Sequence, residues 1–355
     1  MDNTDPDRPA LRGGLLALAA AVLFGISTPL VQRAGLGIGP FSTAALLYLG
    51  AALAGALLRQ PLKREAALQR ADLPRLAWMA LCGAVIGPVA LAWGLQHTSG
   101  TSASLMLALE AVFTVLLARW LYGESMGLRV ATAMALVTAG ALALVLDRGL
   151  GTGTQAAGQL WGLLAVLVAT AAWGLDNSLS RALAERDPGQ VVLCKAALGA
   201  AATAALAWAW REPLPALLPG AALLLIGAIG YGLSLRLYLL AQRAFGAGRT
   251  GSVFAFAPFI GALMALMLGD RSLSAGLIVG SALMLAGVVL HLIESHGHEH
   301  LHDNVQHEHA HHHGDAHHDH PHDSLPEGHH SHAHRHTATR HSHAHVPDAH
   351  HGHRH

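Results

Sequence analysis

Charged residues are scarce in this sequence: Asp, Glu, Lys and Arg make up 12% of its 355 residues, about half of the roughly 25% found in soluble globular domains. Apolar residues make up 52%, so the composition argues against a cytosolic enzyme. Acidic and basic residues balance at 22 each, so no basic excess favours nucleic acid as a partner. The only two cysteines, Cys82 and Cys194, lie in apolar runs, and we expect neither a disulfide framework nor a thiolate metal site.

Lysine is also rare, because Lys63 and Lys195 are the only two in the chain. Neither lies in a glycine-rich phosphate loop, so an ATP-driven engine is not expected. Energy for any transport would have to come from an ion or solute gradient. No nucleophile and base stand out as a catalytic pair, and we expect no enzymatic activity.

Long apolar stretches dominate the rest of the sequence. About 20 apolar residues suffice for a helix to cross roughly 30 Å of hydrocarbon, and ten such stretches are present. They predict an all-α integral membrane protein with ten transmembrane helices and the lipid bilayer as a partner. The stretches are Gly13–Val31, Pro40–Leu58, Leu76–Leu95, Thr101–Leu121, Val130–Leu146, Leu160–Ser180, Gln190–Trp210, Leu217–Leu240, Gly251–Leu268 and Ala275–Ile293.

The loops between these stretches differ in positive charge. With ten spans, thirteen Lys and Arg residues, including Arg59 and Arg75, fall on one side and four, including Arg33 and Arg271, fall on the other. Because cytoplasmic loops are enriched in Lys and Arg, we expect both termini to lie in the cytoplasm. We expect the protein itself in the cell membrane, a bacterial inner membrane.

The two halves of the chain resemble each other at a shift of about 146 to 149 residues. Gly123-Glu124 then aligns with Gly269-Asp270, and Phe24-Gly25 aligns with Trp173-Gly174. Five spans per half would give the copies opposite orientations, and such inverted repeats are typical of secondary transporters. The predicted domains are 13–146 and 159–294, followed by a tail, 295–355. Chance alignment of Ala-, Leu- and Gly-rich helices is the competing explanation.

Three features of the chain indicate a known family: the paired five-span halves, the aromatic-Gly steps in spans one and six, and the run Leu107–Thr114 in a span that is followed by Gly123-Glu124. In these features the chain resembles the EamA-type transporters of the drug/metabolite transporter superfamily. The resemblance implies a ten-helix bundle with a central cavity that moves small solutes by alternating access. The family often has proline just after the position of Glu110, where this chain has Ala111, while Pro258 keeps that feature in span nine. The resemblance therefore does not indicate how span four bends, and it does not cover the tail.

Several polar residues within the spans are candidates for binding cargo or a coupling ion. Glu110 lies at the centre of span four, where a carboxylate is costly and a function is the default interpretation. Protonation there would suit proton coupling, and a structural hydrogen bond is the alternative. Asp176 and Lys195 flank one loop at similar depth and predict a salt bridge, which would serve packing at least as well as transport. Arg236 is a candidate cavity wall that could instead reach the interface.

Further candidates lie at matching positions of the two halves. Ser27, Thr28 and Pro29 in span one mirror Asp176 and Asn177 in span six, and we expect polar helix breaks there. Hydrogen bonding between helices is the alternative. The remaining candidate cargo or ion ligands are Gln96 and His97, and the candidate walls or interfacial anchors are Trp93 and Trp173.

The tail contains 25 of the 27 histidines. It is too polar to build a core, and we expect it to be disordered. Interspersed imidazoles with carboxylates predict binding of divalent Ni, Co or Zn, whereas the zinc-protease pattern H-E-x-x-H is expected here by chance. A pH-responsive tail and a passive metal store remain alternatives. The candidate ligands are His298, His300, His302, His307, His309, His311, His312, His313, His317, His318, His320 and His322.

These features favour a secondary active transporter that exports a divalent transition metal, with the tail collecting the ion. A metabolite or amino-acid exporter whose tail senses metal or pH is the second hypothesis. A membrane-anchored metal store or sensor is a hypothesis of another class. The expected partners are lipid and a small solute or metal ion. We expect no required cofactor. The sequence does not decide whether the protein forms a homodimer.

Overall fold

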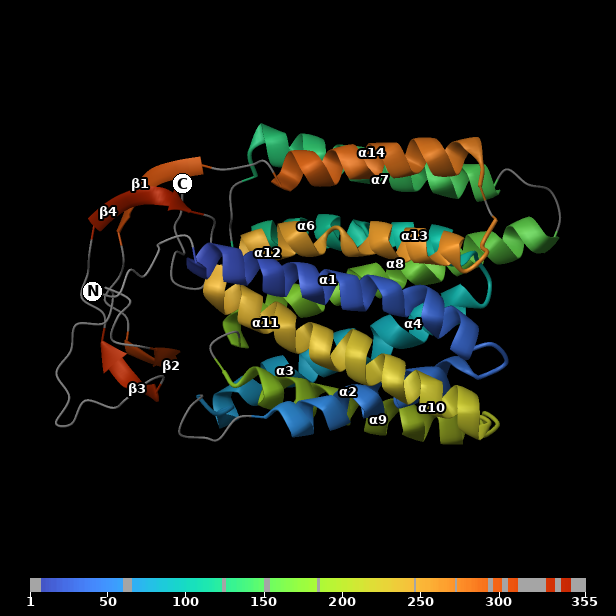
Figure 1. The fold of residues 1–355 in the computed structure, drawn as a ribbon, viewed down its shortest axis with the longest axis horizontal. Helices are drawn as coiled ribbons and strands as arrows, with labels where there is room; N and C mark the ends of the chain where they lie inside the picture. Colours follow the sequence, from blue (N-terminus) through green and yellow to red (C-terminus); the bar gives the residue numbers. More distant parts are fainter. Residues whose placement is uncertain are drawn as a thin grey trace.

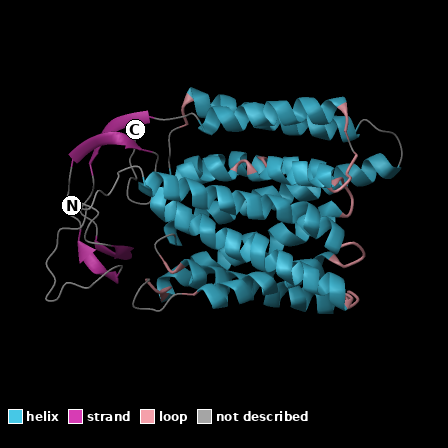
Figure 2. Ribbon diagram, in the orientation of Figure 1, coloured by secondary structure: helices cyan, strands magenta, loops and turns pink. Residues whose placement is uncertain are grey.

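The computed structural model describes residues 8–59, 66–122, 126–149, 154–183, 186–245, 247–271, 273–292, 296–301, 306–311, 330–335 and 340–345. Residues up to 292 in these ranges form a bundle of roughly antiparallel helices (Figure 1), joined by turns and short loops (Figure 2). The runs are rich in Ala and Leu, which favour helix. Because a helix satisfies its backbone polar groups internally, it suits a membrane interior.

Several spans consist of more than one helical element. The helices are α1 (Arg8–Ala34), α2 (Pro40–Leu58), η1 (Arg70–Asp72), α3 (Leu73–Ala80), η2 (Leu81–Ile86), α4 (Gly87–Leu95), α5 (Gly100–Met106), α6 (Leu109–Tyr122), α7 (Leu128–Gly149), α8 (Thr154–Ser180), η3 (Arg181–Leu183), α9 (Pro188–Ala209), α10 (Leu217–Ile226), η4 (Gly227–Leu233), α11 (Ser234–Phe245), α12 (Ala247–Phe254), α13 (Ala257–Met267) and α14 (Ala275–Leu292).

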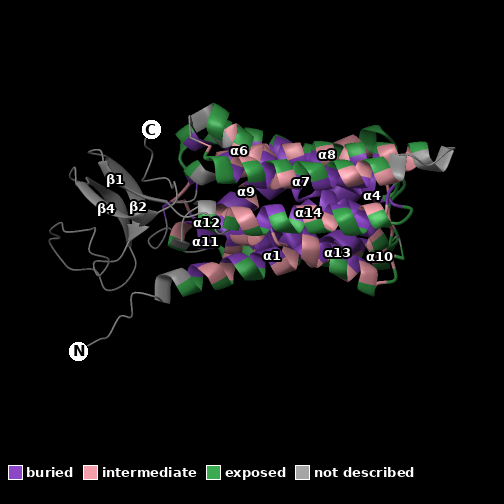
Figure 3. Ribbon diagram, turned by 90° about the horizontal axis from the view of Figure 1, so that it is seen from above, coloured by how far each residue is buried: buried purple, intermediate pink, exposed green. Residues whose placement is uncertain are grey.

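Ten helical segments of the described chain are long and apolar enough to cross a membrane, which confirms the predicted fold class. They agree with the ten predicted stretches to within a few residues at most ends, the third beginning earlier, at Arg70. Exposed residues lie along the outer helices of the bundle (Figure 3), and many of them are large and apolar. Leu57, Trp208 and Leu217, for example, are each more than four-fifths exposed. Such a surface suits contact with lipid.

Helices of the two halves are interleaved in the bundle. Span one, α1, packs against α11 and α13 of the second half, and span six, α8, packs against α4 and α6 of the first half. The second and seventh spans, α2 and α9, pack along each other, as do the fifth and tenth, α7 and α14 (Figure 1). The buried core is therefore shared by both halves.

Helix irregularities occur at corresponding positions of the two halves. The π-helical segments η2 and η4 interrupt spans three and eight. Spans four and nine are each broken, after Met106 and after Phe254. The break in span four forms without proline: Ala108 N–H donates to Leu105 O at 2.9 Å and Glu110 N–H to Leu107 O at 3.0 Å, so the helix tightens into a three-residue spacing.

The expected polar break in span one is wrong, because α1 continues unbroken through Pro29 to Ala34. Ser27 Oγ donates to the Phe24 carbonyl of its own helix at 2.6 Å, a bond that a serine can make without opening the helix. In span six, α8 likewise continues through Asp176 and Asn177. The irregularities lie instead in spans three, four, eight and nine.

Four short strands are described within the tail, whose predicted disorder stays a prediction. Strand β1 (His296–Leu301) pairs antiparallel with β4 (Arg340–His345), and β2 (Gln306–His311) with β3 (His330–Arg335). Backbone pairing needs no apolar core, although a two-stranded sheet alone is marginal in water. Of the predicted tail ligands, His298, His300, His307, His309 and His311 belong to these strands. The others, from His302 and His312 to His322, lie outside the described residues.

Candidate functional site

A cavity of about 60 Å³ lies inside the helix bundle, with room for a few water molecules. Four of the predicted site residues line it together: Glu110, Asp176, Asn177 and Lys195. They come from both halves, since Glu110 is on α6 and the other three are on α8 and α9. The rest of the lining is aromatic, aliphatic or small, and consists of Phe24, Tyr48, Ala51, Trp173, Val192, Ala196, Gly230, Tyr231, Ser234, Leu235, Tyr238 and Phe254.

The predicted salt bridge between Asp176 and Lys195 is present. Lys195 Nζ donates to Asp176 Oδ2, and the side chains of Lys195 and Asp176 are only 3% and 5% exposed. The second carboxylate oxygen, Asp176 Oδ1, is buried without a hydrogen-bond partner among the described residues. A buried carboxylate oxygen with no partner is costly, so this atom is the point at which a donor from a solute would be stabilising.

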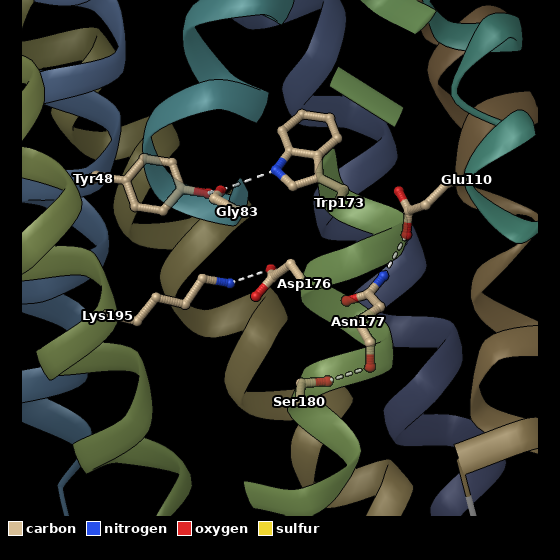
Figure 4. Close-up of polar contacts among 8 residues, drawn as sticks. All are labelled: Tyr48, Gly83, Glu110, Trp173, Asp176, Asn177, Ser180 and Lys195. Carbon is tan, nitrogen blue, oxygen red and sulfur yellow. Dashed lines mark hydrogen bonds and ion pairs between the residues drawn. The ribbon is translucent and has the colours of Figure 1, made fainter. Parts of the chain in front are cut away.

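Glu110 and Asn177 form a second polar pair in the same cavity, shown in Figure 4. The Asn177 side-chain amide Nδ2 donates to Glu110 Oε1, while Ser180 Oγ donates to the main-chain carbonyl of Asn177 at 2.9 Å. Asn177 follows Asp176 directly on α8, so one helical turn of α8 contacts both Glu110 on one side and Lys195 on the other. The two acidic groups therefore belong to one site.

Aromatic side chains form the walls around these polar groups. The rings of Phe24 and Trp173 meet edge to face at 5.6 Å, as do those of Phe24 and Tyr231. Tyr48 contacts Tyr231 at 5.7 Å, and Tyr238 lies beside Phe254 at 5.0 Å. The cavity thus combines one ammonium and two carboxyl groups with a largely apolar enclosure, which suits a small polar solute with an apolar part.

Two predicted site residues lie in the turn between α4 and α5, away from the cavity. His97 is exposed, stacks on Trp93 with 4.0 Å between ring centroids and bonds the Trp93 carbonyl through Nδ1 at 2.7 Å. Gln96 is also exposed, and its Nε2 donates to Ile38 O at 2.8 Å. Neither residue lines the cavity, so neither contacts a solute held there in this conformation.

Three further predicted residues are near the cavity without lining it. Ser27 and Thr28 are buried in α1, and Thr28 Oγ1 has no hydrogen-bond partner among the described residues. Arg236 on α11 is partly buried, and its Nε also lacks a partner within the described chain. The neighbouring Leu235 and Tyr238 contribute to the wall instead. The roles of these three residues stay predictions.

Among the residues that the structure describes, no three His, Cys, Asp or Glu side chains lie close enough together to hold a metal ion. The cavity itself contributes two carboxyl groups and no His, Cys or Met side chain. The tail histidines stay a prediction, because their side chains are not described. The cavity does not have the donor set that Ni, Co or Zn prefers.

Sequence reasoning missed most of the aromatic wall. Trp173 was a candidate, but Phe24, Tyr48, Tyr231, Tyr238 and Phe254 were not. Tyrosine carried a usable signal: three of the four tyrosines in the chain line the cavity. Tyrosine is usually enriched at the membrane interface, so its position in the middle of a span indicates a polar neighbour there.

Comparisons with known proteins agree with this architecture. The model of the EamA-like transporter family matches twice, over residues 11–146 and 160–293. An uncharacterized transporter of Methanothermobacter thermautotrophicus is 27% identical over 297 residues, covering 79% of this chain and 86% of that protein. A probable terminal-alkyne amino-acid exporter of Streptantibioticus cattleyicolor is 29% identical over 270 residues, covering 72% and 84%. A crystal structure that is 19% identical shares the fold with a TM-score of 0.57, covering 79% of this chain and 97% of its own.

Proposed function

Since this chain belongs to the EamA-like transporter family, we propose that it is a secondary active exporter of small zwitterionic solutes with an apolar side chain, such as amino acids. The cargo binds at the cavity between the two halves, which at about 60 Å³ has to widen to admit it. The observation that carries the proposal is the buried Asp176–Lys195 pair within an aromatic enclosure.

A zwitterion is complementary to this ion pair. Its carboxylate would accept from Lys195 Nζ, and its ammonium would donate to Asp176, whose Oδ1 has no partner among the described residues. Lys195 then exchanges the carboxylate of Asp176 for that of the cargo, and Asp176 exchanges the ammonium of Lys195 for that of the cargo. Both buried charges therefore stay compensated throughout binding. An anion or a cation alone would leave one of the two uncompensated.

The aromatic walls would hold the apolar part of the cargo. Phe24, Trp173 and Tyr231 form a joined cluster of rings, and such surfaces favour contact with an apolar side chain. The name of the Streptantibioticus relative, a probable amino-acid exporter, supports both the class of cargo and the direction of transport.

We infer that the two halves are inverted repeats that alternate access to the cavity. The interleaved packing of α1 with α11 and α13, and of α8 with α4 and α6, supports a twofold relation. The matching of η2 with η4, and of the breaks in spans four and nine, supports it as well. Binding between inverted repeats near the midplane is common in secondary transporters.

We assign Glu110 the coupling role. It is the second acidic group in the cavity and is held by Asn177, the neighbour of Asp176. A proton that binds Glu110 when the cavity faces one side and leaves it on the other would couple transport to a proton gradient. The excess of Lys and Arg on the side of the termini supports a cytoplasmic position for both ends.

A metal cargo receives less support. A divalent cation in the cavity would meet the ammonium of Lys195, which repels it, and would find two carboxyl groups without the imidazole ligands that Ni, Co and Zn prefer. We therefore assign any metal binding to the histidine-rich tail alone, separate from the transported solute.

Counterflow into proteoliposomes tests the proposal. Vesicles containing the full chain are loaded with unlabelled L-leucine and diluted into a trace of labelled L-leucine, and transient accumulation of label is expected. Unlabelled L-norvaline and L-phenylalanine added outside should compete. The chlorides of Ni, Co and Zn should not.

Two analogues serve as matched controls for the zwitterion. The compound 4-methylpentanoate lacks the ammonium group of leucine, and 3-methylbutylamine lacks its carboxylate. Both should compete far less than leucine. Absence of L-leucine counterflow, or competition by either analogue as strong as that of unlabelled leucine, would refute the proposed cargo.

A further inference from the structure

The π-helical segment η2 leaves one backbone carbonyl of span three without a backbone donor. In an α-helix Gly83 O would accept from Gly87 N–H, but Gly87 N–H donates to Cys82 O because of the π turn. The five-residue spacing of a π-helix would instead offer residue 88, which is Pro88 and has no N–H. The Gly83 carbonyl must therefore find its donors elsewhere, since an unpaired carbonyl inside a membrane is costly.

Two cavity side chains supply those donors. Trp173 Nε1 donates to Gly83 O at 3.0 Å, and Tyr48 OH donates to the same oxygen, as Figure 4 shows. They come from α8 and α2, on two sides of η2. The orientation of both aromatic walls therefore depends on a carbonyl that does not itself line the cavity.

The Cα of Gly83 faces the ion pair. A Cβ placed on Gly83 would collide with Asp176 Oδ2 and Cγ and would lie 2.9 Å from Lys195 Nζ. These atoms are the ends of side chains, whereas the nearest atom to such a Cβ at Gly50 or Gly227 is a backbone carbonyl oxygen of the facing helix. An alanine at 83 would therefore move the ion pair and leave the helix packing in place.

We propose that Gly83 is the positioning residue of the cargo site: its carbonyl fixes Tyr48 and Trp173, and its missing side chain fixes the Asp176–Lys195 pair. One residue outside the cavity thus sets the distance between the ion pair and the aromatic walls. Pro88 contributes by keeping the Gly83 carbonyl free for the two side chains. The inference deepens the proposed function, on which its transport readout rests.

The first test compares Gly83→Ala with Gly158→Ala. Position 158 lies in α8 and has nothing within 4 Å of an added Cβ, so it controls for a glycine-to-alanine change within a span. In L-leucine counterflow, Gly83→Ala should raise KM on the order of tenfold, equivalent to about 1.4 kcal/mol, with a smaller change in maximal rate. Gly158→Ala should match the unaltered protein. An unchanged KM in folded Gly83→Ala would overturn the proposal.

A second variant covers the case in which Gly83→Ala does not fold. Pro88→Ala keeps every cavity side chain and introduces a backbone N–H that can donate to the Gly83 carbonyl. This new donor competes with Tyr48 and Trp173, so KM should rise in the same direction by a smaller factor. A wild-type KM for this variant would overturn the role assigned to Pro88 and to the carbonyl.

A third measurement needs no cargo. Gly83→Ala is combined with Asp176→Ala and Lys195→Met, and Tm is measured in detergent. If the added methyl acts through the ion pair, it lowers Tm in the unaltered protein and does not lower it once the pair is gone. An equal drop in both backgrounds would overturn the proposal. If the added methyl lowers Tm only while the ion pair is present, and leucine counterflow is absent, the proposed cargo is refuted and the positioning role of Gly83 stands.

Discussion

Removing one charge of the Asp176–Lys195 pair should be far more damaging to stability than removing both. The two side chains are 5% and 3% exposed, so Lys195→Met leaves the Asp176 carboxylate buried without its partner. Breaking a buried pair in this way costs about 3–5 kcal/mol. This is a large share of the roughly 5–15 kcal/mol that separates folded from unfolded proteins.

The double variant Asp176→Leu, Lys195→Met should recover most of that loss. Leucine has the same branching at Cγ as aspartate, and methionine is close in length to lysine, so the volume is kept. Replacement of a buried pair by apolar residues of similar size is often neutral or stabilising. Unfolding in detergent by titration with SDS, followed by circular dichroism, compares the two single variants with the double variant. L-leucine counterflow is measured in parallel.

The expected pattern is an unstable Lys195→Met protein and a stable double variant that does not transport. Such a result would separate stability from function and assign the pair to cargo binding. Leucine transport by the double variant at the rate of the unaltered protein would refute this reasoning, because the pair would then serve packing only. Single variants as stable as the unaltered protein would show that these charges are not buried.

Three other outcomes are expected. Glu110→Gln should abolish proton-driven leucine export in vesicles with an imposed pH gradient while expression stays near normal, and full activity that is independent of pH would contradict the coupling role. Single cysteines placed in the 295–355 tail or in the loop between Arg59 and Arg75 should resist an impermeant maleimide added to intact cells, and labelling of either would contradict the proposed orientation. Deletion of 295–355 should remove binding of Ni and Zn in equilibrium dialysis and leave leucine counterflow unchanged; metal binding retained after the deletion would contradict the assignment of metal to the tail.

The spans and the charged part of the site were predictable from the sequence for the same reason. Twenty apolar residues in a row have few alternatives to a membrane helix, and the ten described spans confirm the ten predicted ones. Against that background Glu110, Asp176 and Lys195 stand out because a buried charge is costly. Asn177 followed from its place beside Asp176. The structure brings all four to one cavity.

The aromatic wall and the π segment were not predictable in the same way. Phe24 or Phe254 in an apolar span is equally compatible with lipid, with helix packing and with a cavity, and periodicity does not distinguish these environments. Ser27 misled because its hydroxyl group bonds the Phe24 carbonyl of its own helix, and Thr28 misled because α1 continues unbroken through it. The signal for η2 was the combination of Gly83, Gly87 and Pro88, which has meaning only once the neighbouring Trp173 is known to donate there.

The break in span four explains how a carboxyl group is tolerated at that depth. The chain has Ala111 where the resembled family often has proline, yet the helix still ends at Met106 and begins again at Leu109. Glu110 is therefore in the first turn of α6, where the positive end of a helix dipole stabilises a carboxylate by roughly 0.3–1 kcal/mol and by up to about 2 kcal/mol in partly buried sites. Ser104 lies on the other side of the break, against Gly261 of α13, so packing of span four on span nine occurs where the tightening occurs. The position of Glu110 and the break are thus related: a continuous helix would place Glu110 in its interior and would remove the dipole that offsets part of the cost of burying its carboxyl group when that group is ionised.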